Sequence, residues 1–202
     1  SLVSLAALAP VAFAGCELEP MPPPYSEERA PCADHDPLKK AYFGDLHVHT
    51  AFSFDAWTYD VRTTPDEAYR FARGEEIRLP PLDANGVGTT VVKIDRPLDF
   101  AAVTDHAEYL GEVSLCTTPG SEVYDTDTCK AYRPPESSFI GLGIGADPPV
   151  RADFCQGNSI CTDAVAPVWK VTRDAAEKAY DRSASCAFTT FVAYEYSLSP
   201  FG

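Results

Sequence analysis

One stretch, YFGDLHVHTAFSFD at positions 42–55, constrains the fold of this chain more than any other. It contains His47 and His49, separated by a single residue. Alternate side chains of an extended strand point to the same face, so the two imidazoles are expected to converge on one point. Such a pair supplies half of a metal site, whereas an isolated HxH pattern is more often a pair of solvent-facing histidines. The interpretation therefore depends on ligands elsewhere in the chain.

Further polar side chains follow two other apolar runs. Asp105, His106 and Glu108 come after the run LDFAAV, and Glu195 ends the run FTTFVAY. Short runs rich in Val, Ala and Phe are typical of buried parallel strands. The carboxyl ends of such strands meet at one edge of a sheet, where sites of α/β proteins form. We therefore predict one site built from three strand ends.

The segments between these strands predict helices, and hence parallel pairing. Thr64, Pro65 and Glu67 form a capping box with proline at the first helical position, and Gly74 ends that helix. Residues 98–104 then provide the next strand, which completes a βαβ unit. The intervening segment is expected to form a small hairpin around the Asn-Gly turn at positions 85 and 86.

A second helix is predicted at residues 165–182, ahead of a last strand at residues 188–196. Its core-facing residues recur at helical spacing. They are Val168, Thr172, Ala175, Ala176 and Ala179.

The seven cysteines are an odd number. If Cys16 is lipidated, six remain in an exported chain, and they allow fifteen pairings. Closeness in sequence favours the pairs Cys116 with Cys129 and Cys155 with Cys161, and elimination leaves Cys32 with Cys186. The four cysteines within residues 111–164 indicate a disulfide-pinned surface insertion over the site.

Residues 1–16 read as the apolar and cleavage regions of a secretory signal. Phe13 to Cys16 resemble a bacterial lipobox, in which Cys16 is acylated, while ordinary cleavage after Ala14 is the alternative. The Pro-rich residues 17–40 then form a tether. We expect an exported protein of the bacterial periplasm or outer membrane that touches the membrane only through its lipid anchor.

The composition of the chain excludes some classes of binding partner. A chain of 202 residues that is 45% hydrophobic can bury one sizeable core. The formal charge of -14 argues against nucleic acids and anionic membrane surfaces, because both bind clusters of Lys and Arg. The sequence does not indicate an oligomeric state.

The phrases HVHT with SFD, then TDHAE and AYEYS, resemble the opening motifs of the PHP (polymerase and histidinol phosphatase) superfamily. The longer wording FGDLHVHTAFSFDAW, TPDEAYRFARGE, AVTDHAEYLG and FTTFVAYEYS resembles its secreted branch, catalogued as domain of unknown function 3604. The resemblance implies that residues 41–202 are the first part of a distorted (β/α)7 barrel. It also implies truncation at the C-terminus, while the signal sequence without an initiator Met or a basic region implies truncation at the N-terminus. This piece alone is therefore expected to be inactive.

The resemblance assigns His47, His49, His106 and Glu195 as ligands, and Asp55 as a candidate ligand of a further ion. Such donors suit two or three Zn, Mn or Fe ions, which activate water for hydrolysis. A small molecule or a phosphoester is the expected substrate. Asp105 is the candidate catalytic residue that orients or deprotonates water, or it supports His106.

Two alternatives remain. An amidohydrolase also begins with HxH and attacks a carbonyl carbon, but by resemblance it uses a strand lysine where this chain has Glu195. A non-catalytic cell-surface binding protein on the same scaffold is the second.

Overall fold

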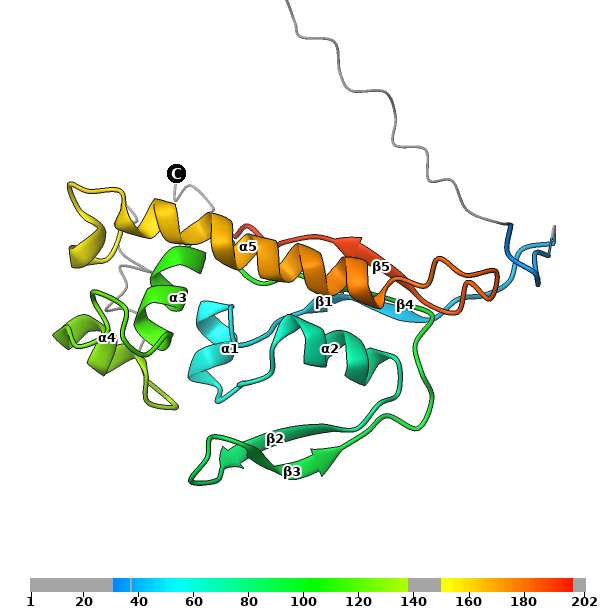
Figure 1. The fold of residues 1–202 in the computed structure, drawn as a ribbon, viewed down its shortest axis with the longest axis horizontal. Helices are drawn as coiled ribbons and strands as arrows, with labels where there is room; N and C mark the ends of the chain where they lie inside the picture. Colours follow the sequence, from blue (N-terminus) through cyan, green and yellow to red (C-terminus); the bar gives the residue numbers. More distant parts are fainter. Residues whose placement is uncertain (1–30, 37, 138–149, 198–202) are drawn as a thin grey trace, which may run out of the picture.

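A computed structural model describes residues 31–36, 38–137 and 150–197. Its centre is a three-stranded parallel sheet in the order β1-β4-β5, and a two-stranded antiparallel hairpin lies apart from it (Figure 1). The elements are β1 (Gly44–Val48), α1 (Phe54–Thr58), α2 (Pro65–Ala72), β2 (Ile77–Leu82), β3 (Gly88–Val92), β4 (Phe100–Val103), α3 (Leu110–Thr117), α4 (Asp127–Tyr132), a 3-10 turn (Asp153–Cys155), α5 (Ile160–Ala179) and β5 (Thr189–Val192).

The α/β class and the parallel pairing predicted from the sequence are confirmed. The strands are shorter than the apolar runs that predicted them. The described residues form an open sheet, so closure into a (β/α)7 barrel stays a prediction.

Helix α2 begins as its sequence predicts. The Thr64 hydroxyl accepts a hydrogen bond from the Glu67 backbone N–H, and the Glu67 carboxylate accepts one from the Thr64 backbone N–H. The chain leaves the helix through Gly74 at φ +81°, a backbone conformation that favours glycine. The predicted hairpin follows, and its turn is closed between Asp83 and Val87.

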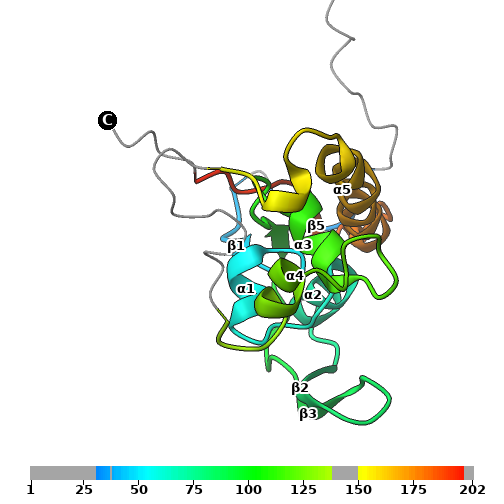
Figure 2. The same ribbon diagram turned by 90° about the vertical axis from the view of Figure 1, so that its left-hand side faces the viewer.

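Helices α2 and α5 cover one face of the sheet, as Figures 1 and 2 show from two directions. All five residues predicted for the inner face of α5 are buried. Tyr69 of α2 joins the layers, because its hydroxyl accepts from the Val103 backbone N–H and donates to the Phe191 carbonyl, both at 3.2 Å. Phe100 and Phe191 lie on the opposite face with their ring centroids 6.2 Å apart.

The three predicted disulfides are all present. They join Cys32 to Cys186, Cys116 to Cys129, and Cys155 to Cys161. The first joins the segment before β1 to the loop before β5, and the other two lie at the α3–α4 end of the molecule. Three disulfides fit a protein of an oxidising compartment outside the cytoplasm.

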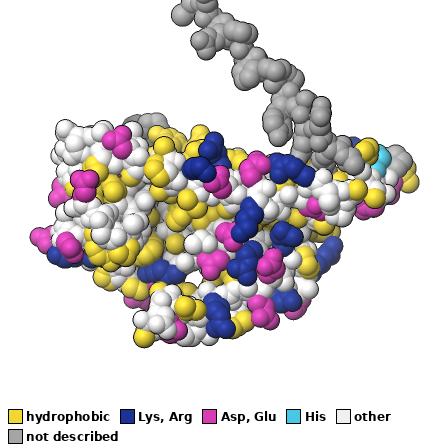
Figure 3. Space-filling view, viewed as in Figure 1, with side chains coloured by type: hydrophobic (Ala, Val, Ile, Leu, Met, Phe, Trp, Pro, Cys, Tyr) yellow, Lys and Arg dark blue, Asp and Glu magenta, His cyan; other side chains and the backbone are white. Residues whose placement is uncertain are grey.

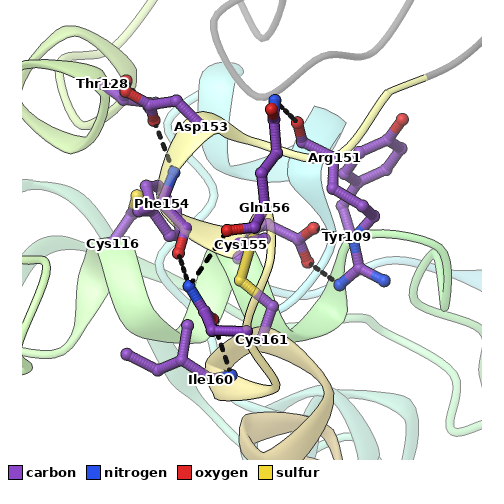
Figure 4. Close-up of a disulfide and its surroundings, with 12 residues drawn as sticks. Tyr109, Cys116, Thr128, Arg151, Asp153, Phe154, Cys155, Gln156, Ile160 and Cys161 are labelled. Carbon is purple, nitrogen blue, oxygen red and sulfur yellow. Dashed lines mark hydrogen bonds and ion pairs between the residues drawn. A yellow bond between two sulfur atoms is a disulfide. The ribbon is translucent and has the colours of Figure 1, made fainter.

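The described part of residues 111–164 contributes most of a hydrophobic core, which also includes Phe54 and Tyr109. Val113, Cys116, Cys129 and Tyr132 are almost fully buried there. Figure 4 shows the disulfide between Cys155 and Cys161 within this region. This core could not be predicted from the sequence, because the apolar residues that form it are spread over short helices and turns without a sustained period.

Helices α3 and α5 approach so closely at Gly111 that a Cβ atom there would lie 2.0 Å from the Cys161 carbonyl oxygen. We expect Gly111→Ala to lower the free energy of unfolding by about 1–3 kcal/mol or more, because backbone must move to admit the methyl group. Urea unfolding would measure the loss. Gly120→Ala is the comparison at a glycine with open space, although its φ of +83° adds backbone strain. Equal stability of Gly111→Ala and the native chain would contradict the close approach.

Acidic and basic side chains alternate over α2 and α5 on the face seen in Figure 3. Lys178 pairs with Asp66 between the two helices, and Arg70 pairs with Glu75 at the end of α2. Exposed pairs of this kind contribute little to stability. Among the described residues, no helix has both the length and the apolarity needed to span a bilayer.

Candidate metal centre

The three strand ends predicted to meet do meet. Beyond β4 and β5, His106 and Glu195 form an isolated parallel bridge, with the Glu195 backbone N–H donating to the Asp105 carbonyl at 3.1 Å. Beside them the Thr104 backbone N–H donates to the Val48 carbonyl at 2.7 Å, which aligns β4 with the end of β1. Strand register thus gathers side chains that are far apart in sequence.

A first group of candidate ligands consists of His47, His49 and Glu195. The Nε2 atoms of both imidazoles lie close to the same carboxylate oxygen, Glu195 Oε2, at 2.8 and 2.9 Å. The ring centroids of the two histidines are 4.9 Å apart. The two side chains therefore converge, as the HxH spacing predicts.

A second group consists of His49, Asp55 and His106. The Nδ1 atom of His49 lies 3.1 Å from both oxygens of Asp55. His106 Nε2 points to the same place, at 3.7 Å from Asp55 Oδ2 and 3.8 Å from Glu195 Oε1. His49 belongs to both groups, so its two ring nitrogens face different carboxylates.

The spacing of these atoms suits divalent metal ions. Ligand atoms about 2.0–2.2 Å from a tetrahedral ion lie roughly 3.3–3.6 Å from one another. The two contacts of His106 Nε2 are too long for hydrogen bonds and close to that separation. Within each group the candidate ligand atoms all lie within 4.8 Å of one another. All five metal ligands predicted from the sequence therefore come together, and imidazole with carboxylate is a donor set for Zn, Mn or Fe.

The charges of the metal-free site are set by His49 and Asp55. The hydrogen bond to Asp55, opposed by burial, raises the pKa of His49 to about 9. Burial opposes ionisation of Asp55, but its hydrogen bonds with His49 and Ser53 outweigh burial and hold its pKa well below the usual range. The hydrogen bond from Ser197 likewise lowers the pKa of Glu195. A cation is thus favoured between the two carboxylates, whether it is a proton on His49 or a metal ion.

Asp105, predicted as the catalytic residue, is buried beside the site. Its two carboxylate oxygens accept hydrogen bonds from the Thr50 backbone N–H and hydroxyl, at 2.5 and 2.8 Å. Burial raises the pKa of Asp105 to about 6, although the bonds from Thr50 act against the shift. In this position Asp105 holds the turn that follows His49.

Exposure changes across the centre. The side chain of His106 is 9% exposed and that of His49 15%, whereas that of His47 is 72% exposed. The centre is therefore open to solvent on the His47 side, and His106 lies at its buried end.

Two supporting residues, Ser53 and Ser197, were not singled out from the sequence. The Ser53 hydroxyl donates to Asp55 at 2.6 Å and accepts from the His106 backbone N–H. The Ser197 hydroxyl donates to Glu195 at 2.6 Å. Each serine lies two residues from the carboxylate it contacts, a spacing that is too common to mark a site without the fold.

A cavity of about 470 Å³ lies between α2, the hairpin and the sheet. Its lining is mostly apolar, with residues such as Tyr69, Ile77 and Val92, and His49 is the one candidate ligand that borders it. The other candidate ligands lie outside this cavity, so we do not place the functional site in it.

The fold and the site define an α/β protein with a candidate metal centre at the carboxyl ends of three parallel strands. The sequence profile of the family described as protein of unknown function DUF3604 matches residues 36–202. The chain belongs to that family. No curated protein and no solved structure matches it.

Proposed function

We propose that this protein is a metal-dependent hydrolase that acts on phosphoesters, on the first strands of a PHP-type barrel. The observation that supports the proposal best is the pair of three-ligand groups that share His49 and lie side by side. Two adjacent ions are the arrangement that many phosphoester hydrolases use.

Divalent ions held here would supply an activated water near neutral pH and positive charge to neutralise a phosphoryl oxygen. The residues of the protein would hold the ions and orient the ligands around them. Glu195 lies between the imidazoles of the first group, and Asp55 lies between those of the second. Asp105 keeps the turn after His49 in place through Thr50, and its role as a base for water stays a prediction.

We infer the substrate class from the same residues. The candidate ligands include two carboxylates, so an anionic substrate needs the charge of bound metal ions to approach. We propose a small-molecule phosphoester that enters past the exposed His47. Export from the cytoplasm agrees with the three disulfides. Lipidation at Cys16, the signal at residues 1–16 and most of the tether lie outside the described residues and stay predictions.

Removal of metal tests this function. The intact protein, dialysed against a chelator and then supplied with Zn, Mn or Fe, is expected to regain release of phosphate from p-nitrophenyl phosphate or a bis-ester. Phosphoester hydrolysis should fall to the level without enzyme after chelation, because the bound ions activate the attacking water in this proposal. Phosphate release and metal content would be measured on the same samples.

The alternatives give different results in that assay. A metal-loaded protein that cleaves amides and leaves phosphoesters intact would favour the amidohydrolase interpretation. A protein that takes up no metal under any condition would contradict the hydrolase and leave a binding protein.

A further inference from the structure

Two buried polar atoms face each other behind the candidate metal centre. They are Nδ1 of His106 and Oε2 of Glu108, 3.4 Å apart. Neither has a hydrogen-bond partner among the described residues. The side chains are 9% and 3% exposed, so water does not readily take the place of a partner. Buried polar atoms are nearly always paired, and a pair left so close together indicates an interaction that completes when the site is loaded.

The other nitrogen of the same ring faces the candidate ligands. His106 Nε2 points toward Asp55 and Glu195, at 3.7 and 3.8 Å. The ring is also stacked on Phe54, with centroids 4.4 Å apart and an interplanar angle of 27°. Stacking fixes the plane of the imidazole, but it does not decide which nitrogen carries the proton.

We propose that Glu108 is a positioning residue that sets the tautomer of His106. A neutral imidazole carries one N–H, and a metal ligand must offer the nitrogen without it. A carboxylate at Nδ1 accepts that N–H, which leaves the lone pair of Nε2 directed at Asp55 and Glu195. This inference rests on the proposed function, because it gives His106 the role of a metal ligand.

Glu108 also ties His106 to a second ligand. Its other oxygen, Oε1, accepts a hydrogen bond from the Ser197 backbone N–H at 2.5 Å. The hydroxyl of the same serine donates to Glu195 Oε1 at 2.6 Å. One buried carboxylate thus links the loop after β4 to the loop after β5, so it positions two ligands from different strands together.

Glu108→Gln gives a sharp test, because it keeps the size of the side chain. The amide has one acceptor, but the ring N–H and the Ser197 N–H are both donors. Whichever way the amide is oriented, an NH₂ group opposes one of them. If the amide oxygen stays on Ser197, the proton of His106 moves to Nε2 and blocks the ligand atom.

The first readout is the ¹⁵N spectrum of His106 in the metal-free protein, at a pH where the ring is neutral, with the signal assigned by His106→Gln. The native protein is expected to show the proton on Nδ1, and Glu108→Gln a shift toward Nε2. The second readout is zinc affinity by chelator competition, expected to be about 10- to 100-fold weaker in Glu108→Gln. Glu112→Gln is the matched control, since Glu112 is a buried carboxylate of α3 that pairs with Arg151 and belongs to neither ligand group of the centre.

An unchanged tautomer and unchanged zinc affinity in Glu108→Gln would overturn the inference. An equal loss of affinity in Glu112→Gln would overturn it too, because the effect would then be general destabilisation. If the native protein binds none of Zn, Mn and Fe, the proposed function fails, and the tautomer measurement still decides whether Glu108 orients His106.

Discussion

Replacing His49 with alanine is expected to empty both candidate metal positions, whereas replacing His47 is expected to empty one. His49 is shared by the two ligand groups, with Glu195 Oε2 2.9 Å from Nε2 and Asp55 3.1 Å from Nδ1. His47 belongs to the first group alone. Each missing imidazole should weaken binding at its position by at least about 100-fold, more than loss of a supporting residue costs. Elemental analysis of the intact protein and both variants would measure the number of ions per chain.

His35→Ala is the matched control. It also removes an imidazole, but His35 lies in the exposed segment before β1 and belongs to neither ligand group. Its metal content should equal that of the native protein. Full metal content in His49→Ala would show that the ions are held elsewhere, and the proposed centre would be abandoned.

Removal of the disulfide between Cys32 and Cys186 is expected to lower the free energy of unfolding more than removal of either other disulfide would through loop entropy. The reason is that this bond closes the longest loop in the unfolded chain. The bond spans 154 residues, and a loop of that length corresponds to about 5 kcal/mol in the chain-entropy treatment. The double variant to alanine should therefore unfold at much lower urea concentration. Tryptophan fluorescence during urea unfolding would give the change in free energy.

The pair Cys155–Cys161 is the comparison. It spans only 6 residues, for which the same treatment gives about 2 kcal/mol. These cysteines are buried, so alanine there adds the cost of a cavity, while the longer bond acts mainly through the loop it closes. A smaller loss for the long bond than for the short one would indicate that the reduced chain keeps residual structure between its ends.

Much of the fold follows from local patterns. The capping box at Thr64 predicts the start of α2, and the spacing of Val168, Thr172 and Ala176 predicts the inner face of α5. These predictions succeed because a helix repeats every 3.6 residues and its caps lie within one turn. The core of the α3–α4 region was missed, since its buried residues come from short elements held together by disulfides.

The candidate site also has a part that the sequence predicts and a part that it does not. The sequence places its ligands at strand ends, and the HxH spacing brings His47 and His49 to one face because a strand repeats every two residues. The partner of Glu108 was not predictable, because the contact between Nδ1 and Oε2 depends on rotamers and on the path of the chain after β4.

The sequence by itself determined the chemical types of the ligands and their order along parallel strands, and it favoured the cysteine pairing that the structure contains. The tertiary structure alone decided that His49 is shared between Asp55 and Glu195, that Asp105 bonds to Thr50, and that Glu108 lies behind His106. The reason is physical. Backbone periodicity acts over a few residues, whereas the contact between His49 and Glu195 spans 146 residues and exists only once strand register and side-chain packing are set.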